Sequence, residues 1–189
     1  MGAVYDCTQP SRRPADDRGL PCPRSTLAAS GGLDTREALA LADDAVAYRE
    51  QLGSAHTVIK MATEEVLECA LALGDRAKAE AVLVVLDALR PGELTPLYRA
   101  MRARFRGRLV DDVSAEVYFR EAEQVYESLG MPFHLAVTRL EHAEALASQA
   151  QSTEADTLRA TASAVFDRLD ARPWRERAGD IPAGEPIPA

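Results

Sequence analysis

Apolar residues recur every three or four positions between residues 34 and 178, which is the period of an amphipathic α-helix. In the stretch 55–73, Val66 and Cys69 fall on one face, while charged residues such as Glu64 fall on the other. Breaks in this pattern coincide with glycine and proline. We therefore predict about seven helices, at residues 34–52, 55–73 and 76–89, and from residues 95, 114, 132 and 152 onward.

Capping residues support several of these helix ends. Asp34 is a good N-cap, and Thr95 followed by Pro96 places an N-cap before a proline that needs no hydrogen-bonded N–H in the first helical turn. In the stretch ESLGMPFHLA, Gly130 is expected to end one helix, and Pro132 begins the next. The sequence therefore predicts short corners between consecutive helices.

The apolar pattern also predicts which side of each helix is buried. Helix 76–89 contains AVLVVL and is apolar nearly all round, so we expect it to be the most buried helix. The next helices are expected to bury Met101 and Phe105, and later Leu140 and Phe166. The first helix is expected to pack through the stripe formed by Leu41, Ala45, Tyr48 and Leu52.

The helix ends recur at a regular interval. Compare AVAYREQLG at 45–53 with AEQVYESLG at 122–130. The terminal leucines, Leu52, Leu89, Leu129 and Leu169, lie 37, 40 and 40 residues apart. A period in this range is typical of stacked two-helix units. The sequence therefore predicts an all-α, right-handed stack of antiparallel helix pairs.

Three segments carry a resemblance to a known family: GDRAKAEAVLVVLDALRPGE, YFREAEQVYESLGMPFHLAVTRLEHAEAL and AVFDRLDARPWRERA. They resemble the tetratricopeptide-like C-terminal repeat region of large bacterial, mostly actinobacterial, signalling regulators. In those proteins a cyclase or helix-turn-helix domain accompanies an ATPase core. The resemblance implies a tetratricopeptide-like solenoid in a bacterial signalling protein. Because the sequence has no GxxxxGK[ST] phosphate loop, the ATPase activity of those regulators is not carried over.

Composition sets the class of protein and its expected domain limits. The chain of 189 residues carries a net charge of −8, which disfavours direct binding of nucleic acid. Proline-rich ends predict a disordered segment at 1–33 and a disordered tail at 179–189, around a helical domain at 34–178. We find no apolar run long enough for a membrane span, and no signal peptide. With three cysteines and no CxxC pair, a cytoplasmic location is expected.

Residues that carry chemistry are few. His134 and His142 are interpreted as polar residues at the surface or between helices, because their spacing does not form a metal-binding motif. Cys69 lies on an apolar stripe and is interpreted as a small buried residue. Trp174 is expected to cover the end of the core beneath the last helix. We therefore expect no enzyme activity, no cofactor and no metal.

The segment YRAMRARFRGR is the main local anomaly. Arg99, Arg102 and Arg106 are spaced to form one stripe on the helix that begins at residue 95. One interpretation is ion pairing with acidic residues of neighbouring helices, such as Asp111, Asp112 or Glu116. The other is an anchor for an acidic peptide or a terminal carboxylate, since arginine donates two parallel hydrogen bonds.

These features favour a non-catalytic module that binds a protein or peptide segment in a helical groove. The alternatives are an enzyme or small-ligand-binding protein with its site in that groove, or a remnant of a larger regulator. The candidate partner-binding residues are Lys60, Glu64, Arg99, Arg102, Arg106, His134, Thr138 and Glu141. A homo-oligomer through the first helix is also expected, with Leu39, Ala42 and Val46 as candidate self-association residues.

Overall fold

The computed structural model describes residues 34–110, 114–149 and 152–179, and these ranges contain helices and connections but no strand. The all-α prediction is therefore confirmed. The predicted disordered ends fall on residues outside these ranges, except for Gly179, which ends the last helix. The helices are α2 (Thr35–Ala47), α3 (Arg49–Leu52), α4 (Thr57–Ala72), α5 (Arg76–Asp87), α6 (Pro96–Leu109), α7 (Ser114–Ser128), α8 (Pro132–Ser148), α9 (Ser152–Arg168) and α10 (Arg172–Gly179).

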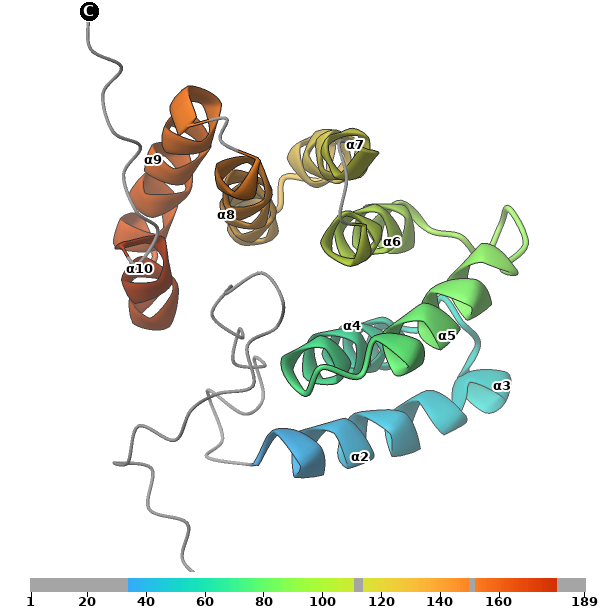
Figure 1. The fold of residues 1–189 in the computed structure, drawn as a ribbon. Helices are drawn as coiled ribbons and strands as arrows, with labels where there is room; N and C mark the ends of the chain where they lie inside the picture. Colours follow the sequence, from blue (N-terminus) through green and yellow to red (C-terminus); the bar gives the residue numbers. More distant parts are fainter. Residues whose placement is uncertain (1–33, 111–113, 150–151, 180–189) are drawn as a thin grey trace, which may run out of the picture.

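Consecutive helices pack against one another along an arc. Figure 1 shows α6 and α8 on the inner side of this arc, with α7 and α9 outside them; α4 continues the inner row, with α2 outside it, and α5 overlaps α4 in this view. The inner helices also contact one another, α4 with α6 and α6 with α8. Helix α2 packs on α4 at one end, and α10 packs on α9 at the other. Residues about one helix pair apart in sequence therefore meet on the inner side.

The predicted capping residues are confirmed. The Thr95 hydroxyl accepts a hydrogen bond from the backbone N–H of Tyr98, and Pro96 occupies the first turn of α6. Gly130 adopts a left-handed φ of 63° after α7. There the N–H groups of Gly130 and Met131 donate to the carbonyls of Glu127 and Tyr126, the pattern of a Schellman motif. This motif satisfies the last carbonyls of α7 and turns the chain into α8.

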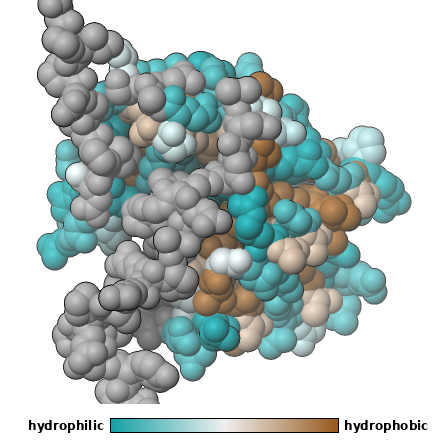
Figure 2. All heavy atoms as spheres, in the orientation of Figure 1, coloured by the Kyte–Doolittle hydropathy of each residue, from teal (hydrophilic) through white to brown (hydrophobic). Residues whose placement is uncertain are grey.

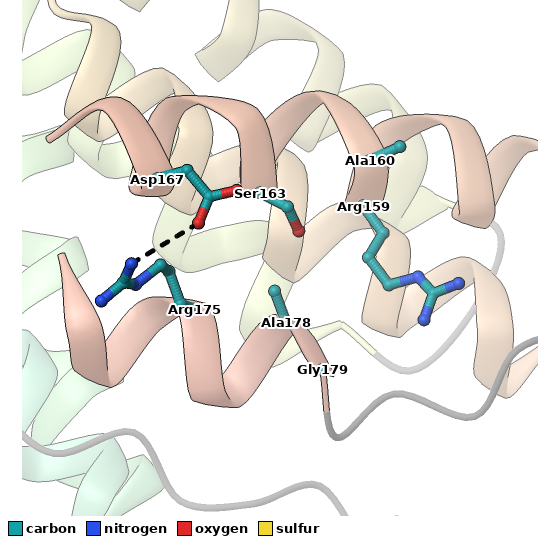
Figure 3. A pocket seen from close by; sticks show the side chains of 7 residues that line it. All are labelled: Arg159, Ala160, Ser163, Asp167, Arg175, Ala178 and Gly179. Carbon is teal, nitrogen blue, oxygen red and sulfur yellow. Dashed lines mark ion pairs between the residues drawn. The ribbon is translucent and has the colours of Figure 1, made fainter. Parts of the chain in front are cut away.

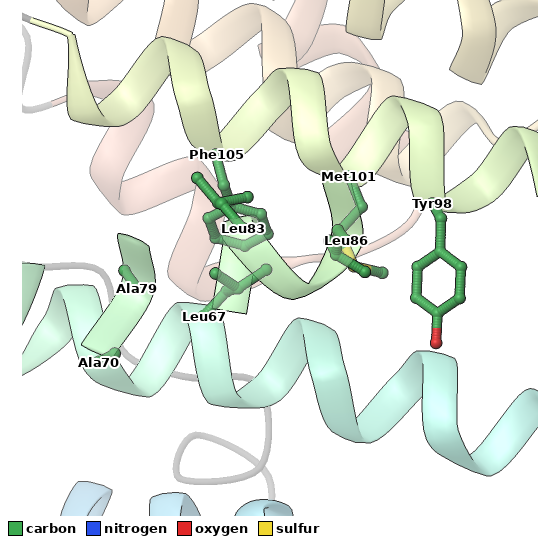
Figure 4. Packing of buried hydrophobic residues seen from close by; sticks show 8 residues of the cluster. All are labelled: Leu67, Ala70, Ala79, Leu83, Leu86, Tyr98, Met101 and Phe105. Carbon is green, nitrogen blue, oxygen red and sulfur yellow. The ribbon is translucent and has the colours of Figure 1, made fainter. Parts of the chain in front are cut away.

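The first apolar core lies where α4, α5 and α6 meet (Figure 4). Leu67 of α4, Leu86 of α5 and Phe105 of α6 are buried there, next to Met101. A second core joins α8, α9 and α10 around Leu140 and Phe166. Burying a large apolar side chain contributes roughly 1.5–3 kcal/mol, so these clusters are a main source of stability.

The first predicted helix is divided, and its buried face differs from the expected one. The chain bends at Tyr48, which separates α2 from α3. Helix α2 packs on α4 and buries Ala38 and Ala42, whereas Leu41, Tyr48 and Leu52 are about half exposed. The predicted inward stripe is therefore wrong, because small alanines allow close approach to α4.

This geometry also corrects the candidate self-association residues. Ala42 is only 4% exposed, and Leu39 and Val46 are partly buried. The apolar surface that α2 and α3 leave open is formed instead by Leu41, Tyr48 and Leu52. Among these candidates only Ala42 is closed off, because α4 packs on the α2 face that carries Ala38 and Ala42; Leu39 and Val46 remain partly exposed and stay candidates.

Helix α5 is not the most buried helix, contrary to the prediction. It buries Ala79, Leu83 and Leu86, but Val84 is 66% exposed and Val85 is 39% exposed. Helix α5 packs against α4 and α6 and leaves the side that carries Val84 exposed. An apolar sequence therefore does not ensure burial in a helix with neighbours on one side only.

The C-terminal end is closed by a helix that the sequence pattern did not reveal. Trp174 of α10 stacks on Phe166 at 5.9 Å between ring centroids and meets Phe133 edge-on, also at 5.9 Å. The role predicted for Trp174, covering the end of the core, is confirmed. Because α10 ends at Gly179, the helical region extends one residue beyond the expected limit of 178.

On the face shown in Figure 2, the described residues left visible are mostly polar, with apolar residues gathered between them. In the described ranges, none of the helices is both long enough and apolar enough to cross a membrane. Several charged residues, among them Glu68, Arg104 and Glu141, are nevertheless buried where α4, α6 and α8 meet.

Candidate functional site

Arg104 of α6 is a buried arginine surrounded by three glutamates. Its side chain is 2% exposed. It forms two parallel hydrogen bonds with Glu141 of α8, from Nε at 2.7 Å and from Nη2 at 2.8 Å. On the other side it contacts Glu64 of α4 at 3.2 Å and Glu68 of the same helix. One guanidinium group therefore joins all three inner helices.

Two further arginines extend this arrangement. Arg108 of α6 donates to Glu68 at 2.7 Å and lies 3.4 Å from Glu141. Arg177 of α10 forms two parallel hydrogen bonds with Glu144 of α8, at 2.8 and 2.6 Å. We name the whole set the inner charged cluster. Its members are Glu64, Glu68, Arg104, Arg108, Glu141, Glu144 and Arg177.

Burial and ion pairing act on this cluster in opposite directions. Burial raises the pKa of Glu68, but Arg104 and Arg108 outweigh it and lower that pKa to about 2. Burial disfavours the charged form of Arg104, yet Glu141 and Glu68 raise its pKa well above the usual value. Both groups therefore stay charged at neutral pH, and their charges are compensated within the inner charged cluster.

Glu144 and Tyr126 are shifted mainly by burial. Burial raises the pKa of Glu144, and the nearby Arg177 only partly offsets this effect. Burial together with the charge of Glu64 raises the pKa of Tyr126, which stays a neutral phenol. The Tyr126 hydroxyl therefore keeps its proton near the inner charged cluster.

The two candidate histidines take different positions. His134 lies at the edge of the cluster, with Nε2 at 3.7 Å from Glu64, and its ring stacks on Tyr126 at 5.4 Å between centroids. His142 is buried, with Nδ1 at 2.8 Å from a carboxylate oxygen of Glu123 on α7. The predicted role of the histidines as polar residues between helices is thus confirmed for His142.

The arginine stripe predicted from the sequence faces the other way. Arg102 lies 3.4 Å from Asp87 of α5, and Arg106 contacts the same carboxylate. Arg99 lies 3.9 Å from Glu121 of α7. These three arginines form ion pairs toward α5 and α7, and do not join the inner charged cluster.

The remaining candidates divide into two groups. Glu64, His134 and Glu141 are brought together on the inner side. Glu141 was expected to face outward but is 3% exposed, because Arg104 draws it into the helix interface. Thr138 is fully buried and donates to the carbonyl of His134 in its own helix at 2.8 Å. Lys60 is half-buried on α4.

Sequence reasoning missed Glu68, Arg104, Arg108, Glu144 and Arg177, and it placed Glu68 outward. A usable signal was present. Glu64 and Glu68, like Arg104 and Arg108, are four residues apart, and the two pairs have opposite charge. Glu64 lies 40 residues before Arg104, and Glu68 lies 40 residues before Arg108. The same interval separates Leu89 from Leu129. Combining charge with that repeat interval would have predicted their contact.

Two shallow cavities lie elsewhere. One, of about 330 Å³, lies between α9 and α10. In Figure 3, Arg175 points toward Asp167 at one end of this cavity, and Arg159 lies at the other end. The second, of about 390 Å³, lies between α3 and the end of α5. Among the described residues, no three His, Cys, Asp or Glu side chains are placed to hold a metal ion.

Comparison with known proteins adds no relative. No protein-family model matches the chain, and no curated protein or solved structure matches it either.

Proposed function

We propose that this chain is a non-catalytic protein-interaction module that binds a partner segment along the face formed by α4, α6 and α8. In this proposal the helices form a right-handed, tetratricopeptide-like stack of antiparallel pairs, as the 37- to 40-residue interval predicts. The resemblance described above would make it a module of a bacterial signalling regulator.

The observation that carries the proposal is the convergence of charged side chains from three inner helices on Arg104. Fixed ion pairs hold these helices in one relative position, so the inner face does not need to be ordered when a partner binds. Such preorganisation lowers the entropy cost of association. Partly exposed residues at the edge of this face, Glu64 and His134, are suited to contact a bound segment.

Recognition of a peptide by a helical groove depends on anchors at fixed spacing. Met61 is 66% exposed on α4, three residues before Glu64 and seven before Glu68, so it lies on the same side of the helix. An apolar anchor therefore lies next to a polar one.

The test compares two faces of the same module. A partner is captured from native cells and purified, and its affinity is measured against a Lys60→Glu/His134→Ala variant of the inner face. The matched control is Arg99→Glu/Arg102→Glu, which changes the side toward α5 and α7. We expect only the inner-face variant to weaken binding. Loss of binding in the control alone would instead support the arginine stripe as the contact.

A further inference from the structure

Two hydrogen-bond donors beside the inner charged cluster have no hydrogen-bond partner within the described residues. They are the hydroxyl of Tyr126 and the Nη1 group of Arg177. Tyr126 is fully buried and Arg177 is 11% exposed. An unsatisfied buried donor is costly, and native proteins seldom leave one without a ligand, water or another partner.

Both donors lie near the same carboxylate. Arg177 Nη1 is 3.9 Å from Glu141, which is too far for a hydrogen bond. Tyr126 reaches the cluster from α7 through a contact with small residues of α6, Ala100 and Ala103. Its hydroxyl lies within the field of Glu64, Arg104 and Glu141. Both donors therefore lie at the inner charged cluster.

Charge selects the kind of acceptor that these donors fit. The cluster contains four carboxylates against three guanidinium groups, a net charge of −1 when all are ionised. A further carboxylate would be repelled by Glu64 and Glu141. A cationic side chain would bring further hydrogen-bond donors next to two donors that already lack an acceptor. A neutral oxygen acceptor avoids both costs.

We infer that Tyr126 Oη and Arg177 Nη1 donate hydrogen bonds to uncharged amide carbonyl groups of a partner segment. This inference rests on the proposed function and specifies the partner chemistry, which is an amide carbonyl of the main chain or of an Asn or Gln side chain. His134 stacks over Tyr126 and is 28% exposed, and its 3.7 Å contact with Glu64 is longer than a hydrogen bond. In this inference the segment displaces His134, the partly exposed residue stacked on the Tyr126 ring, to reach the hydroxyl.

Two tyrosine-to-phenylalanine variants test the inference. Tyr126→Phe removes a hydroxyl that lacks an internal partner, whereas Tyr98→Phe removes one that donates to the carbonyl of Ser54 at 2.8 Å. A phage-displayed random peptide library is selected on the full chain. The selected peptides are then measured by calorimetry against the wild type and both variants.

We expect Tyr126→Phe to keep the wild-type Tm and to weaken peptide binding about tenfold, the effect of one hydrogen bond. Tyr98→Phe should lower the Tm and leave the affinity unchanged. Replacing Asn and Gln of the peptide with Ala separates side-chain from main-chain carbonyls: a loss of affinity identifies the former, and retention identifies the latter.

Equal binding by Tyr126→Phe, or peptides that need Asp or Glu, would overturn this inference and leave the interaction module intact. A Tm lowered by Tyr126→Phe as much as by Tyr98→Phe would also overturn it, because the hydroxyl would then have an internal partner. If no peptide from the library binds the full chain, that result would count against both the inference and the proposed function.

Discussion

Helices α5 and α8 show how weakly local hydrophobicity determines burial in this molecule. Helix α5 carries the most apolar run of the chain, yet it exposes Val84 and Val85. Helix α8 carries Glu141, His142 and Glu144, and all three are buried. The difference follows from position, because α8 contacts α6, α7 and α9, whereas α5 contacts only α4 and α6 to a comparable extent among the described helices. Burial is set by the number of neighbouring helices.

The largest expected effect on stability is tested with two apolar residues of α5, one buried and one exposed. Leu86 is 2% exposed, and Leu86→Asp buries an unpaired charge, which should remove more than about 4 kcal/mol of the free energy of unfolding. Val84 is 66% exposed, and Val84→Asp should change stability by less than about 0.5 kcal/mol. Urea denaturation measures both. Similar losses in the two variants would show that the assigned buried side of α5 is wrong.

The second prediction concerns the ion pairs that link α4, α6 and α8. Arg104→Ala leaves Glu68 and Glu141 buried without their central partner, and should cost about 3–5 kcal/mol. Arg102 lies two residues away and pairs with Asp87 at the surface, so Arg102→Ala should cost at most about 1 kcal/mol. Thermal and urea unfolding of the two variants compare the inner and outer sides of one helix. A mild effect of Arg104→Ala would mean that the cluster is solvated.

The third prediction tests the same cluster by pH. The pKa of Glu68 is lowered from 4.5 to about 2, so the folded state binds fewer protons than the unfolded state in this interval. The stability that Glu68 contributes is therefore present above about pH 4.5 and is lost as the pH falls toward about 2. Unfolding free energies across this interval should fall more steeply for the wild type than for Glu68→Gln.

Glu144 does not disturb this comparison. Its pKa is raised by burial, so its own contribution has the opposite dependence on pH, and it is present in both proteins. Parallel pH profiles of wild type and Glu68→Gln would contradict the ion pairing of Glu68 with Arg104 and Arg108.

The smallest effect on stability is expected on the open face of α2. Leu41 is 56% exposed, so Leu41→Glu should leave the Tm unchanged, whereas Leu39→Glu alters a partly buried side chain and should lower it. Self-association through the first helix stays a prediction, and sedimentation of Leu41→Glu tests it on the exposed residues. If the wild type self-associates through this surface, Leu41→Glu should be monomeric. A wild type that sediments as a monomer at high concentration would remove the prediction.

The sequence by itself determined where most of the helices lie and, for several of them, the residues at which they begin or end. Thr95 and Pro96 begin α6, and Gly130 ends α7, because capping and left-handed φ angles depend on a few adjacent residues. The buried apolar residues of α6, such as Met101 and Phe105, also followed from periodicity. Trp174 was correctly assigned to the end of the core, although the helix that carries it was not foreseen.

Only the tertiary structure decided which side of several helices is buried. In α2 the small residues Ala38 and Ala42 are buried against α4, whereas Leu41 is exposed. In the arginine-rich α6, Arg104 enters the inner face, whereas Arg99 and Arg106 pair with residues of α7 and α5. Charged residues were assigned outward because burial of a single charge is unfavourable. In this fold Arg104 is buried together with Glu68 and Glu141 from two other helices, and that compensation exists only once the helices have been brought side by side.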